Sequence, residues 1–306
     1  MELLFEQLIY YICYLAFFIL AFGVLLAIYP FDDACSKTMI LRRRLVGVLA
    51  VIFALGIIWV RFAEPSLLLT KRYDLSALGQ TQKIKIAVAS DFHYGVFKNA
   101  PNLKRIVEKI NKENPDLVFL PGDFVYQAPK TTIEGMFSEL KNLKVPVFTV
   151  WGNHDVGLLG EIDDKQELKA ELGKYATMLE NEQTQVVVNG KTINLLGLGD
   201  LREGKTDFQK LQTLKVGDFN LVLVHNPDAV HYFPKNLPVN LVISGHTHAG
   251  QIRVPFLYKT YLPSDFGIEK GVYTIGGIKT LVTSGIGVSI LPFRFLVPPE
   301  IMFVEI

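Results

Sequence analysis

Residues 242–254 read V-I-S-G-H-T-H-A-G-Q-I-R-V, and the interpretation of the whole chain starts from them. An apolar run typical of a buried strand leads into a glycine and then into His246 and His248, which lie two positions apart. In an extended backbone this spacing points both imidazole rings to the same side. The pair therefore has the spacing of two metal ligands, although His-x-His pairs also occur on ordinary sheet surfaces.

Four upstream stretches place polar residues in the same position, directly after an apolar run. They are S-D-F-H with Asp91 and His93, P-G-D-F with Asp123, W-G-N-H-D with Asn153, His154 and Asp155, and V-H-N-P-D with His225. Open α/β sheets carry their ligand-binding residues in the loops at the carboxyl ends of strands. The five stretches together predict one site at such an edge.

Each of these residues also has an ordinary structural interpretation when it is taken alone. Asp91 and Asp123 are common types in turns and helix caps, as Asn153 is in turns. His225 can be a hydrogen-bonded histidine of the core. Five of the six histidines, however, follow strand-like runs, and only His231 does not. This concentration favours a shared function over separate structural roles.

From residue 83 onward, short apolar runs alternate with segments of helical periodicity. Strands are predicted at residues 84–89, 116–120, 145–150, 185–188, 193–196, 221–224, 241–243, 273–274, 280–283 and 302–305. Helices are predicted at residues 132–143, 164–179 and 227–233, and one includes Leu103, Ile106, Val107 and Ile110. Early strands alternate with helices and later strands come in pairs, which indicates an α/β sandwich with mixed sheets.

Residues 1–70 differ from the rest, and we expect them to form a membrane anchor with two transmembrane helices. Residues 8–29 are an uncharged apolar run of 22 residues, about the length that crosses a bilayer. Residues 45–60 are a shorter run that ends near Trp59, a residue type common at membrane interfaces. This second run can also be an interfacial or buried helix. The three arginines before it faintly resemble a twin-arginine signal.

The distribution of basic residues indicates on which side of the membrane the catalytic domain lies. The segment between the two apolar runs holds four of them, Lys37 and the arginines 42–44. Three follow the second run: Arg61, Lys71 and Arg72. Because cytoplasmic segments carry the excess of Lys and Arg, the count favours an extracytoplasmic catalytic domain by a narrow margin.

The composition excludes several other classes of protein. Lys and Arg total 31 against 30 Asp and Glu, and this net charge of +1 gives no reason to expect nucleic-acid binding. Cys13 and Cys35 are the only cysteines, and both precede residue 83. Residues 83–306 therefore contain neither a disulfide framework nor a thiolate zinc site.

The candidate ligands comprise two Asp, one Asn and four His, which offer oxygen and imidazole donors without sulfur. Such a set suits Mn, Fe, Zn, Ni or Co rather than a structural zinc cage. Seven ligands exceed the needs of one ion. They suit two divalent ions about 3.5–4 Å apart with a bridging carboxylate, an arrangement that clamps both reacting oxygens of a phosphoryl displacement.

The ordered motifs D-x-H, G-D, G-N-H-D, a lone histidine and G-H-T-H resemble those of the calcineurin-like metallophosphoesterases across residues 83–306. The resemblance implies a four-layer αββα sandwich. The ligands it implies form two sets that share Asp123 as a bridge: Asp91, His93 and His248 for one ion, and Asn153, His225 and His246 for the other. It further implies that His154 contacts the scissile phosphate or the leaving group and that Asp155 orients His154.

Finer features are similar to membrane-associated bacterial members, which include UDP-2,3-diacylglucosamine pyrophosphatases. These features are H-N-P-D at residues 225–228, G-H-T-H-A-G-Q at residues 245–251 and P-F-R-F-L-V-P-P-E-I at residues 292–301. Ala249 stands where a second glycine is common, a departure that need not affect metal ligation.

Beyond the last ligand, Gln251 and Arg253 are candidates for binding substrate oxygens, although Arg253 can equally be a surface residue. Residues 254–273 carry many aromatic and aliphatic side chains. They form either an ordinary packed loop or an apolar rim that touches the bilayer or holds an acyl chain.

The sequence therefore predicts a membrane-anchored, dinuclear metal-dependent phosphohydrolase that cleaves a phosphodiester or pyrophosphate bond, on a lipid-linked or nucleotide-lipid substrate. Nucleotide-lipid precursors lie on the cytoplasmic face, so an extracytoplasmic domain would instead act on a phosphoester of the cell envelope. A non-catalytic metal-binding scaffold is the first alternative, and the intact His154 argues against it. A nuclease is the second, and the balanced charge argues against it.

Overall fold

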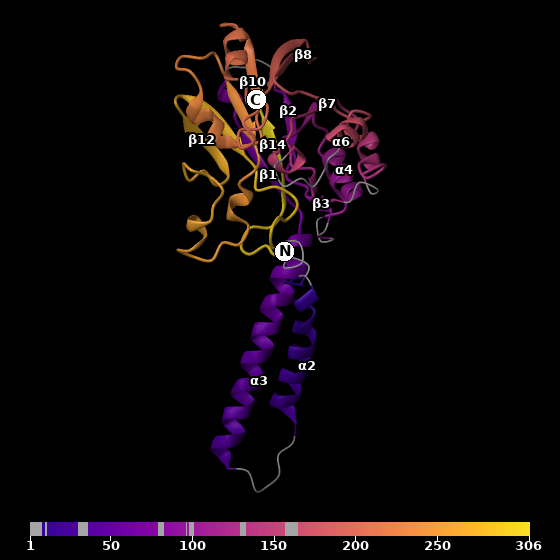
Figure 1. Ribbon diagram of the computed structural model, residues 1–306, viewed down its shortest axis with the longest axis vertical. Helices are drawn as coiled ribbons and strands as arrows, with labels where there is room; N and C mark the ends of the chain where they lie inside the picture. The colour runs from indigo at the N-terminus through magenta and orange to yellow at the C-terminus, as the bar shows by residue number, and fades with distance from the viewer. Residues whose placement is uncertain are drawn as a thin grey trace.

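The computed structural model describes residues 8–9, 11–29, 36–78, 83–95, 97, 101–128, 133–156 and 165–306. Figure 1 shows a body built on β-sheets and a pair of helices that extends from one end of it. The helix pair precedes the body in the chain, and the first strand of the body begins at Leu69.

The first sheet has six strands in the order β1-β14-β2-β4-β6-β7. They are β1 (Leu69–Asp74), β14 (Glu300–Glu305), β2 (Lys85–Val88), β4 (Leu117–Leu120), β6 (Val147–Thr149) and β7 (Thr177–Met178). β2, β4, β6 and β7 run parallel, β14 is antiparallel to β2, and β1 is parallel to β14. The carboxyl ends of β2, β4 and β6 therefore lie at one edge of the sheet.

The second sheet also has six strands, in the order β12-β13-β11-β10-β9-β8. They are β12 (Gly271–Ile275), β13 (Ile278–Val282), β11 (Leu241–Ser244), β10 (Phe219–Leu223), β9 (Lys191–Gly197) and β8 (Glu182–Val188). The four inner strands run parallel, whereas β12 and β8 are antiparallel hairpin partners at the two sides. A short parallel pair, β3 (Tyr94–Gly95) and β5 (Val125–Tyr126), joins the loops after β2 and β4.

Side chains that alternate along the central strands fill a core on each face. In β2, Ile86 and Val88 enter the core between the two sheets together with side chains from β10 and β11, whereas Ala87 faces the helical side. The outer layers are α4 (Leu103–Lys112) and α6 (Lys165–Leu172) over the first sheet, and the 3₁₀ helices η6 (Phe208–Thr213) and η7 (Pro227–Tyr232) over the second. The body is thus a layered α/β sandwich in which one outer layer consists of 3₁₀ turns.

Three predicted helices differ from the observed structure. The described part of residues 132–143 forms a turn and the 3₁₀ helix η5 (Ser138–Asn142), because Gly135 has a left-handed backbone with φ 74°. Residues 227–233 form η7, which is too short to sustain α-helical hydrogen bonding. The helix predicted at residues 164–179 ends at Leu172, before Gly173, and β7 then enters the first sheet. Residues 132 and 164 themselves lie outside the described chain.

The sequence does not predict β1, because its side chains are exposed or half-buried and show no apolar run. β1 pairs with β14 along its whole length. The sheet therefore starts at Leu69, ahead of residue 83, where the sequence places the beginning of the catalytic region.

Two apolar helices, α2 (Leu15–Ile28) and α3 (Lys37–Ile58), lie side by side before the body (Figure 1). They approach each other at Gly23 and Gly47, where a Cβ on Gly47 would lie 2.7 Å from the carbonyl oxygen of Gly23. Small residues at such positions allow two helix backbones to pack closely.

α3 is longer than the predicted run 45–60. It begins at Lys37, with Ser36 as its N-cap, so the arginines 42–44 lie inside the helix rather than in a link before it. Together with η1 (Trp59–Ala63) and η2 (Glu64–Ser66) it forms a segment of 30 residues that is long and apolar enough to cross a membrane. α2 covers only residues 15–28 of the predicted run 8–29, and its 14 residues are shorter than such a span.

Candidate metal centre

The predicted ligands lie in loops that follow parallel strands of both sheets. Asp91 and His93 follow β2, Asp123 follows β4, Asn153 follows β6, His225 follows β10, and His246 and His248 follow β11. The His93 N–H donates to the Asp123 carbonyl (3.1 Å) within the first sheet's loops. The His246 N–H donates across to the Asp91 carboxylate (3.0 Å). The two sheets thus bring the seven residues, here called the metal centre, to one edge.

Five of these residues have a left-handed backbone, which non-glycine residues rarely adopt. Their φ values are 55° at Asp91, 48° at His93, 55° at Asp123, 70° at His246 and 46° at His248. Each such conformation costs about 1–2 kcal/mol, and such conformations recur at functional sites.

Two glycines make room for the strained loops. A Cβ on Gly152 would lie 2.1 Å from Oδ1 of Asp123, and a Cβ on Gly245 would lie 2.5 Å from Oδ2 of Asp91. Both distances are far below van der Waals contact, so any larger residue would displace a carboxylate. The glycines of the G-N-H-D and G-H-T-H motifs are therefore explained by close approach.

Three side chains form the first group of donor atoms. His93 Nε2 lies 2.9 Å from His248 Nε2, and His248 Nε2 lies 3.6 Å from Oδ1 of Asp91. All three side chains are buried, and their donor atoms lie within 4.8 Å of one another. This is the set that the resemblance to the calcineurin-like metallophosphoesterases implies for one ion.

The second group contains Asp123, His225 and His246, also buried. His225 Nε2 lies 3.1 Å from Oδ2 of Asp123 and 3.2 Å from Nδ1 of His246. The same Oδ2 lies 3.5 Å from His93 Nε2 of the first group. Asp123 therefore stands between the two groups, the position that a bridging ligand requires.

The donor set fits divalent cations. Buried Oδ1 of Asn153 and buried Nε2 of His246 have no hydrogen-bond partner within the described chain, although such atoms are normally paired. Burial lowers the pKa of His93 to about 3 and also lowers the pKa of His248, so both rings are neutral and offer a lone pair. Burial raises the pKa of Asp91 to about 7, although the neighbouring His225 acts in the opposite direction.

His154 lies beside the metal centre on α5 (Asn153–Val156). It is half-buried, and its N–H donates to Oδ1 of Asp123 (2.9 Å). Its ring centroid lies 5.0 Å from that of His93 and 5.0 Å from that of Tyr126. Burial lowers its pKa, so the ring is neutral at pH 7.

The Asp155 carboxylate faces backbone N–H groups rather than the ring of His154. It accepts hydrogen bonds from the N–H groups of Asp123 (2.8 Å), Gly152 (3.0 Å), Phe124 (2.8 Å) and Val125 (3.3 Å). These bonds join the loop after β4 to the loop after β6. The hydrogen bonds of Asp155 therefore hold the loop that carries Asp123, whereas the resemblance implies that Asp155 orients His154.

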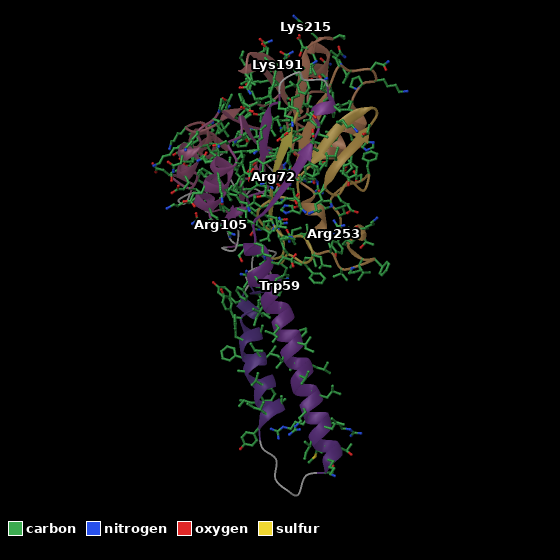
Figure 2. All side chains as sticks on the ribbon, turned by 180° about the vertical axis from the view of Figure 1, so that it is seen from behind. Trp59, Arg72, Arg105, Lys191, Lys215 and Arg253 are labelled. Carbon is green, nitrogen blue, oxygen red and sulfur yellow. The ribbon has the colours of Figure 1, made fainter. Side chains whose placement is uncertain are left out.

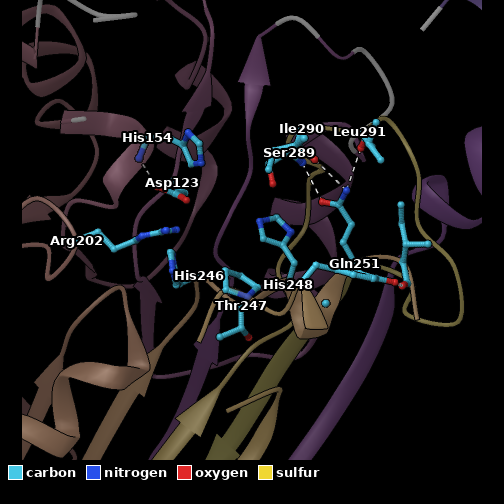
Figure 3. Close-up of a pocket in the computed structure, with 14 residues that line it drawn as sticks. Asp123, His154, Arg202, His246, Thr247, His248, Gln251, Ser289, Ile290 and Leu291 are labelled. Atoms are coloured by element: carbon cyan, nitrogen blue, oxygen red, sulfur yellow. Dashed lines mark hydrogen bonds between the residues drawn. The ribbon is translucent and has the colours of Figure 1, made fainter. Parts of the chain in front are cut away.

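A pocket of about 360 Å³ opens from the metal centre (Figure 3). Asp123, His154, His246 and His248 line its inner end. Apolar side chains form much of the remaining lining, which we call the apolar wall (Ile252, Tyr261, Pro263, Ile290 and Leu291), and Figure 3 places Ile290 and Leu291 on the side away from Asp123 and His154. A ligand in this pocket would meet charged and metal-binding groups at one end and hydrocarbon at the other.

Gln251 lines the pocket, but its side-chain amide is used within the protein. It donates to the carbonyl oxygens of Ser289 (3.0 Å) and Leu291 (2.9 Å) and accepts from the Ser289 N–H (2.9 Å). It therefore holds the segment after β13 against the loop after β11. The structure places it as a positioning residue of the apolar wall.

Arg253, the other predicted substrate-binding residue, does not line the pocket. Its guanidinium lies 2.6 Å from Glu269 and 4.3 Å from the centroid of the Tyr258 ring. Tyr258 in turn donates to Glu269 (2.9 Å). The surface role is thus the one that the structure supports for Arg253.

Two arginines near the centre are absent from the sequence prediction. Arg202 lines the pocket and points toward Asp123 and His246 from the turn after β9 (Figure 3). Arg294 is fully buried, donates to the carbonyl oxygens of Gly287 and Ser284, and has Nη2 3.3 Å from His248 Nδ1. Arg202 follows a strand as the ligands do, which is a usable signal. A lone arginine in the apolar run P-F-R-F is the corresponding signal for Arg294.

The comparison with known families agrees with this geometry. The family model described as calcineurin-like phosphoesterase matches residues 84–250, which include the loops after β2, β4, β6, β10 and β11. The chain belongs to this family. It is accordingly a phosphoesterase, and family members normally bind divalent metal ions.

Three relatives show how the family varies. The metallophosphoesterase YkuE of Bacillus subtilis is 32% identical over 79% of this chain and 87% of its own. The phosphodiesterase YaeI of Escherichia coli is 29% identical over 88% of this chain and 100% of its own. The UDP-2,3-diacylglucosamine pyrophosphatase LpxG of Chlamydia muridarum is 26% identical over 80% of this chain and 91% of its own.

Proposed function

We propose that this phosphoesterase is a membrane-anchored dinuclear enzyme that cleaves a phosphodiester or pyrophosphate bond in a lipid-linked substrate. The observation that carries the proposal is the pocket, whose inner end is the metal centre and whose remaining lining includes the apolar wall. The metal centre can bind the phosphoester, and the apolar wall can pack against a hydrocarbon group of the same substrate.

The proposed ligands are Asp91, His93 and His248 for one ion, and Asn153, His225 and His246 for the other, with Asp123 between them. Bound divalent ions would supply an activated water and neutralise charge on phosphate oxygens. The unpaired acceptors of Asn153 and His246 support this assignment.

The chain's own side chains bind and orient the phosphoester. His154 lies at the inner end of the pocket, where a neutral ring can donate a hydrogen bond to the leaving oxygen. Arg202 approaches the same place and pairs with a non-bridging oxygen. Asp155 acts through Asp123, since three backbone N–H groups of the Asp123 loop donate to its carboxylate and hold that loop in place.

The lipid-linked substrate is supported by the apolar wall and by the relative LpxG, whose name gives a diacylated glucosamine nucleotide as substrate. The membrane anchor is supported by α3, and its arginines 42–44 lie at the end remote from the body. By the positive-inside rule that end is cytoplasmic, which places the body on the outer side. A phosphoester of the cell envelope is then the substrate class.

The test uses full-length protein in detergent, loaded with Mn²⁺. We expect hydrolysis of bis-p-nitrophenyl phosphate that a chelator removes and Mn²⁺ restores, and that Asp123→Ala lacks. A mass-spectrometric comparison of membrane lipid extracts before and after incubation should then reveal a consumed phospholipid-linked species. Turnover of soluble nucleotides alone would overturn the lipid assignment, and activity that survives Asp123→Ala would overturn the dinuclear centre.

A further inference from the structure

Several of the most exposed apolar side chains of the body lie on two neighbouring loops. Phe256 is 96% exposed and Leu257 is 59% exposed, on the loop after the last ligand. Ile290 is 59% exposed and Leu296 is 61% exposed, on the segment between β13 and β14. With Val254 they form a surface that we call the apolar rim. Contiguous exposed apolar side chains mark a surface that meets another apolar phase.

Three residues of the apolar rim have a left-handed backbone. The φ values are 69° at Phe256, 60° at Ile290 and 59° at Leu296. For bulky or β-branched residues this conformation is a genuine outlier, and a buried core that would compensate for it is missing at these exposed tips. The apolar side chains therefore stand out of the body at an energetic cost, which suggests that contact outside the body is their role.

Hydrogen bonds connect the apolar rim to the end of the apolar helix. The Arg294 N–H donates to the carbonyl of Val60 in η1, which directly continues α3 (3.0 Å). The next residue, Phe295, donates to the Gln251 carbonyl (3.0 Å) and accepts from the Arg253 N–H (2.9 Å). Both loops of the rim therefore adjoin the point where the helix enters the body.

The figures show the same arrangement from two sides. In Figure 1 the orange loops near residue 255 lie at the end of the body from which the helices extend. Figure 2 places Trp59 and Arg253 at that end and Lys215 at the opposite end. Trp59 is half exposed, as expected for a tryptophan at a membrane interface.

We propose that the apolar rim inserts into the same bilayer that α3 crosses. This proposal rests on the membrane anchoring proposed above. The occupant is lipid rather than a protein, because the rim is continuous with the end of an apolar helix whose side chains are exposed along its length. Ile290 belongs both to the rim and to the pocket wall. The rim and the pocket therefore meet at Ile290, which offers a lipid chain a route from the bilayer toward the metal centre.

The depth of the rim can be measured without any substrate. An environment-sensitive NBD fluorophore is attached to Phe256→Cys in full-length protein that carries Cys13→Ser and Cys35→Ser, reconstituted in phosphatidylcholine–phosphatidylglycerol vesicles. The matched control is Val216→Cys, since Val216 is 88% exposed and adjoins Lys215 at the far end. We expect nitroxide-labelled lipids to quench the label at position 256 and to leave the label at position 216 unchanged.

Two other results would overturn the proposal. Equal, weak quenching at both positions would place the rim in water. A blue-shifted label at position 256 that depends on protein density, and that lipid quenchers do not reach, would make a second copy of the chain the occupant. Neither result depends on catalysis, so the proposed function is judged separately by the hydrolysis assays.

A paired variant, Phe256→Ser with Leu257→Ser, tests the functional consequence. Neither residue lines the pocket, so hydrolysis of soluble bis-p-nitrophenyl phosphate should be unchanged. Turnover of a phosphodiester embedded in vesicles should fall about tenfold, because two apolar side chains no longer enter the bilayer. An equal rate on vesicle substrate would contradict the role of the rim in substrate entry.

Discussion

The metal centre and the apolar rim use the same unusual backbone conformation in opposite environments. His246 in the centre has φ 70° and is 5% exposed, whereas Phe256 in the rim has φ 69° and is 96% exposed. In the centre, hydrogen bonds between the two sheets hold the strained loops. In the rim no comparable packing surrounds the exposed side chain. Strain in the centre is thus stabilised from within, and strain in the rim indicates contact with something outside the body.

The largest expected effect is the loss of hydrolysis when Asp123 is changed, and this change should leave the apolar rim unaffected. Asp123→Asn keeps the shape of the side chain but removes the charge between the two ligand groups. We expect hydrolysis to fall to background, a larger loss than the about 10²- to 10⁴-fold that one proton-transfer residue contributes. Bound manganese, measured by inductively coupled plasma mass spectrometry, should fall with it, while the label at position 256 stays in the bilayer.

The control for Asp123→Asn is His231→Gln, because His231 stacks on Phe266 (3.7 Å between ring centroids) outside the metal centre. It should keep both activity and metal. An Asp123→Asn protein that retained its metal content and rate would show that Asp123 is not the bridge.

The next prediction tests whether His154 is a catalytic residue or a metal ligand. His154→Gln should lower kcat and kcat/KM together by about 10²- to 10⁴-fold, since its hydrogen bond forms only as the leaving oxygen gains charge. The metal content should be unchanged. A loss of metal would instead make His154 a ligand, which its distance to His93 and Asp123 also permits.

The clustering of the candidate ligands could be predicted because each of them follows a strand, so a local pattern of an apolar run and a polar turn marks each one. The partners of a long side chain, in contrast, can come from distant positions in the sequence, and a local pattern does not reveal them. Arg253 was a candidate for substrate binding, yet Glu269, sixteen residues further along the chain, pairs with it at the surface. Asp155 shows the same limit, because three of its four partners are backbone N–H groups of a loop 30–32 residues earlier.

Strands could be predicted from the sequence where their side chains are buried, because burial leaves an apolar pattern, and they could not be predicted where the side chains are exposed. The strands of the second sheet were found from their apolar runs, whereas β1 was missed because its side chains are largely exposed. The 3₁₀ helices η5 and η7 were predicted as α-helices, because the spacing of apolar residues over so few positions does not distinguish the two kinds of helix. The rim remained one of two alternatives, because exposure of residues 254–273 depends on how the residues just before them, 251–253, pair with Phe295 of a segment about 40 residues later.

A smaller effect is expected for Arg202, which faces the pocket from the side opposite the apolar wall. Arg202→Met should lower kcat/KM by about 10- to 100-fold, mainly through KM, because one charge-assisted hydrogen bond to a phosphate oxygen is lost. Lys205→Met removes a charge from the same turn outside the pocket and should leave the rate unchanged. Equal effects of the two variants would mean that Arg202 acts only through the overall charge.

The smallest effect tests whether the rim is truly strained. Asparagine tolerates a left-handed backbone better than leucine, so Leu296→Asn should raise the unfolding free energy in detergent by about 1 kcal/mol. Val216→Asn, at an exposed apolar position without a positive φ, should not. The same Leu296→Asn variant should hydrolyse vesicle-borne substrate more slowly, because an apolar side chain is lost from the bilayer contact. A variant that is more stable but turns over vesicle-borne substrate more slowly would show that the apolar side chains of the rim lower the stability of the body and serve the contact with the bilayer. If Leu296→Asn and Val216→Asn change stability equally, the left-handed leucine carries no strain and the contrast between the two regions disappears.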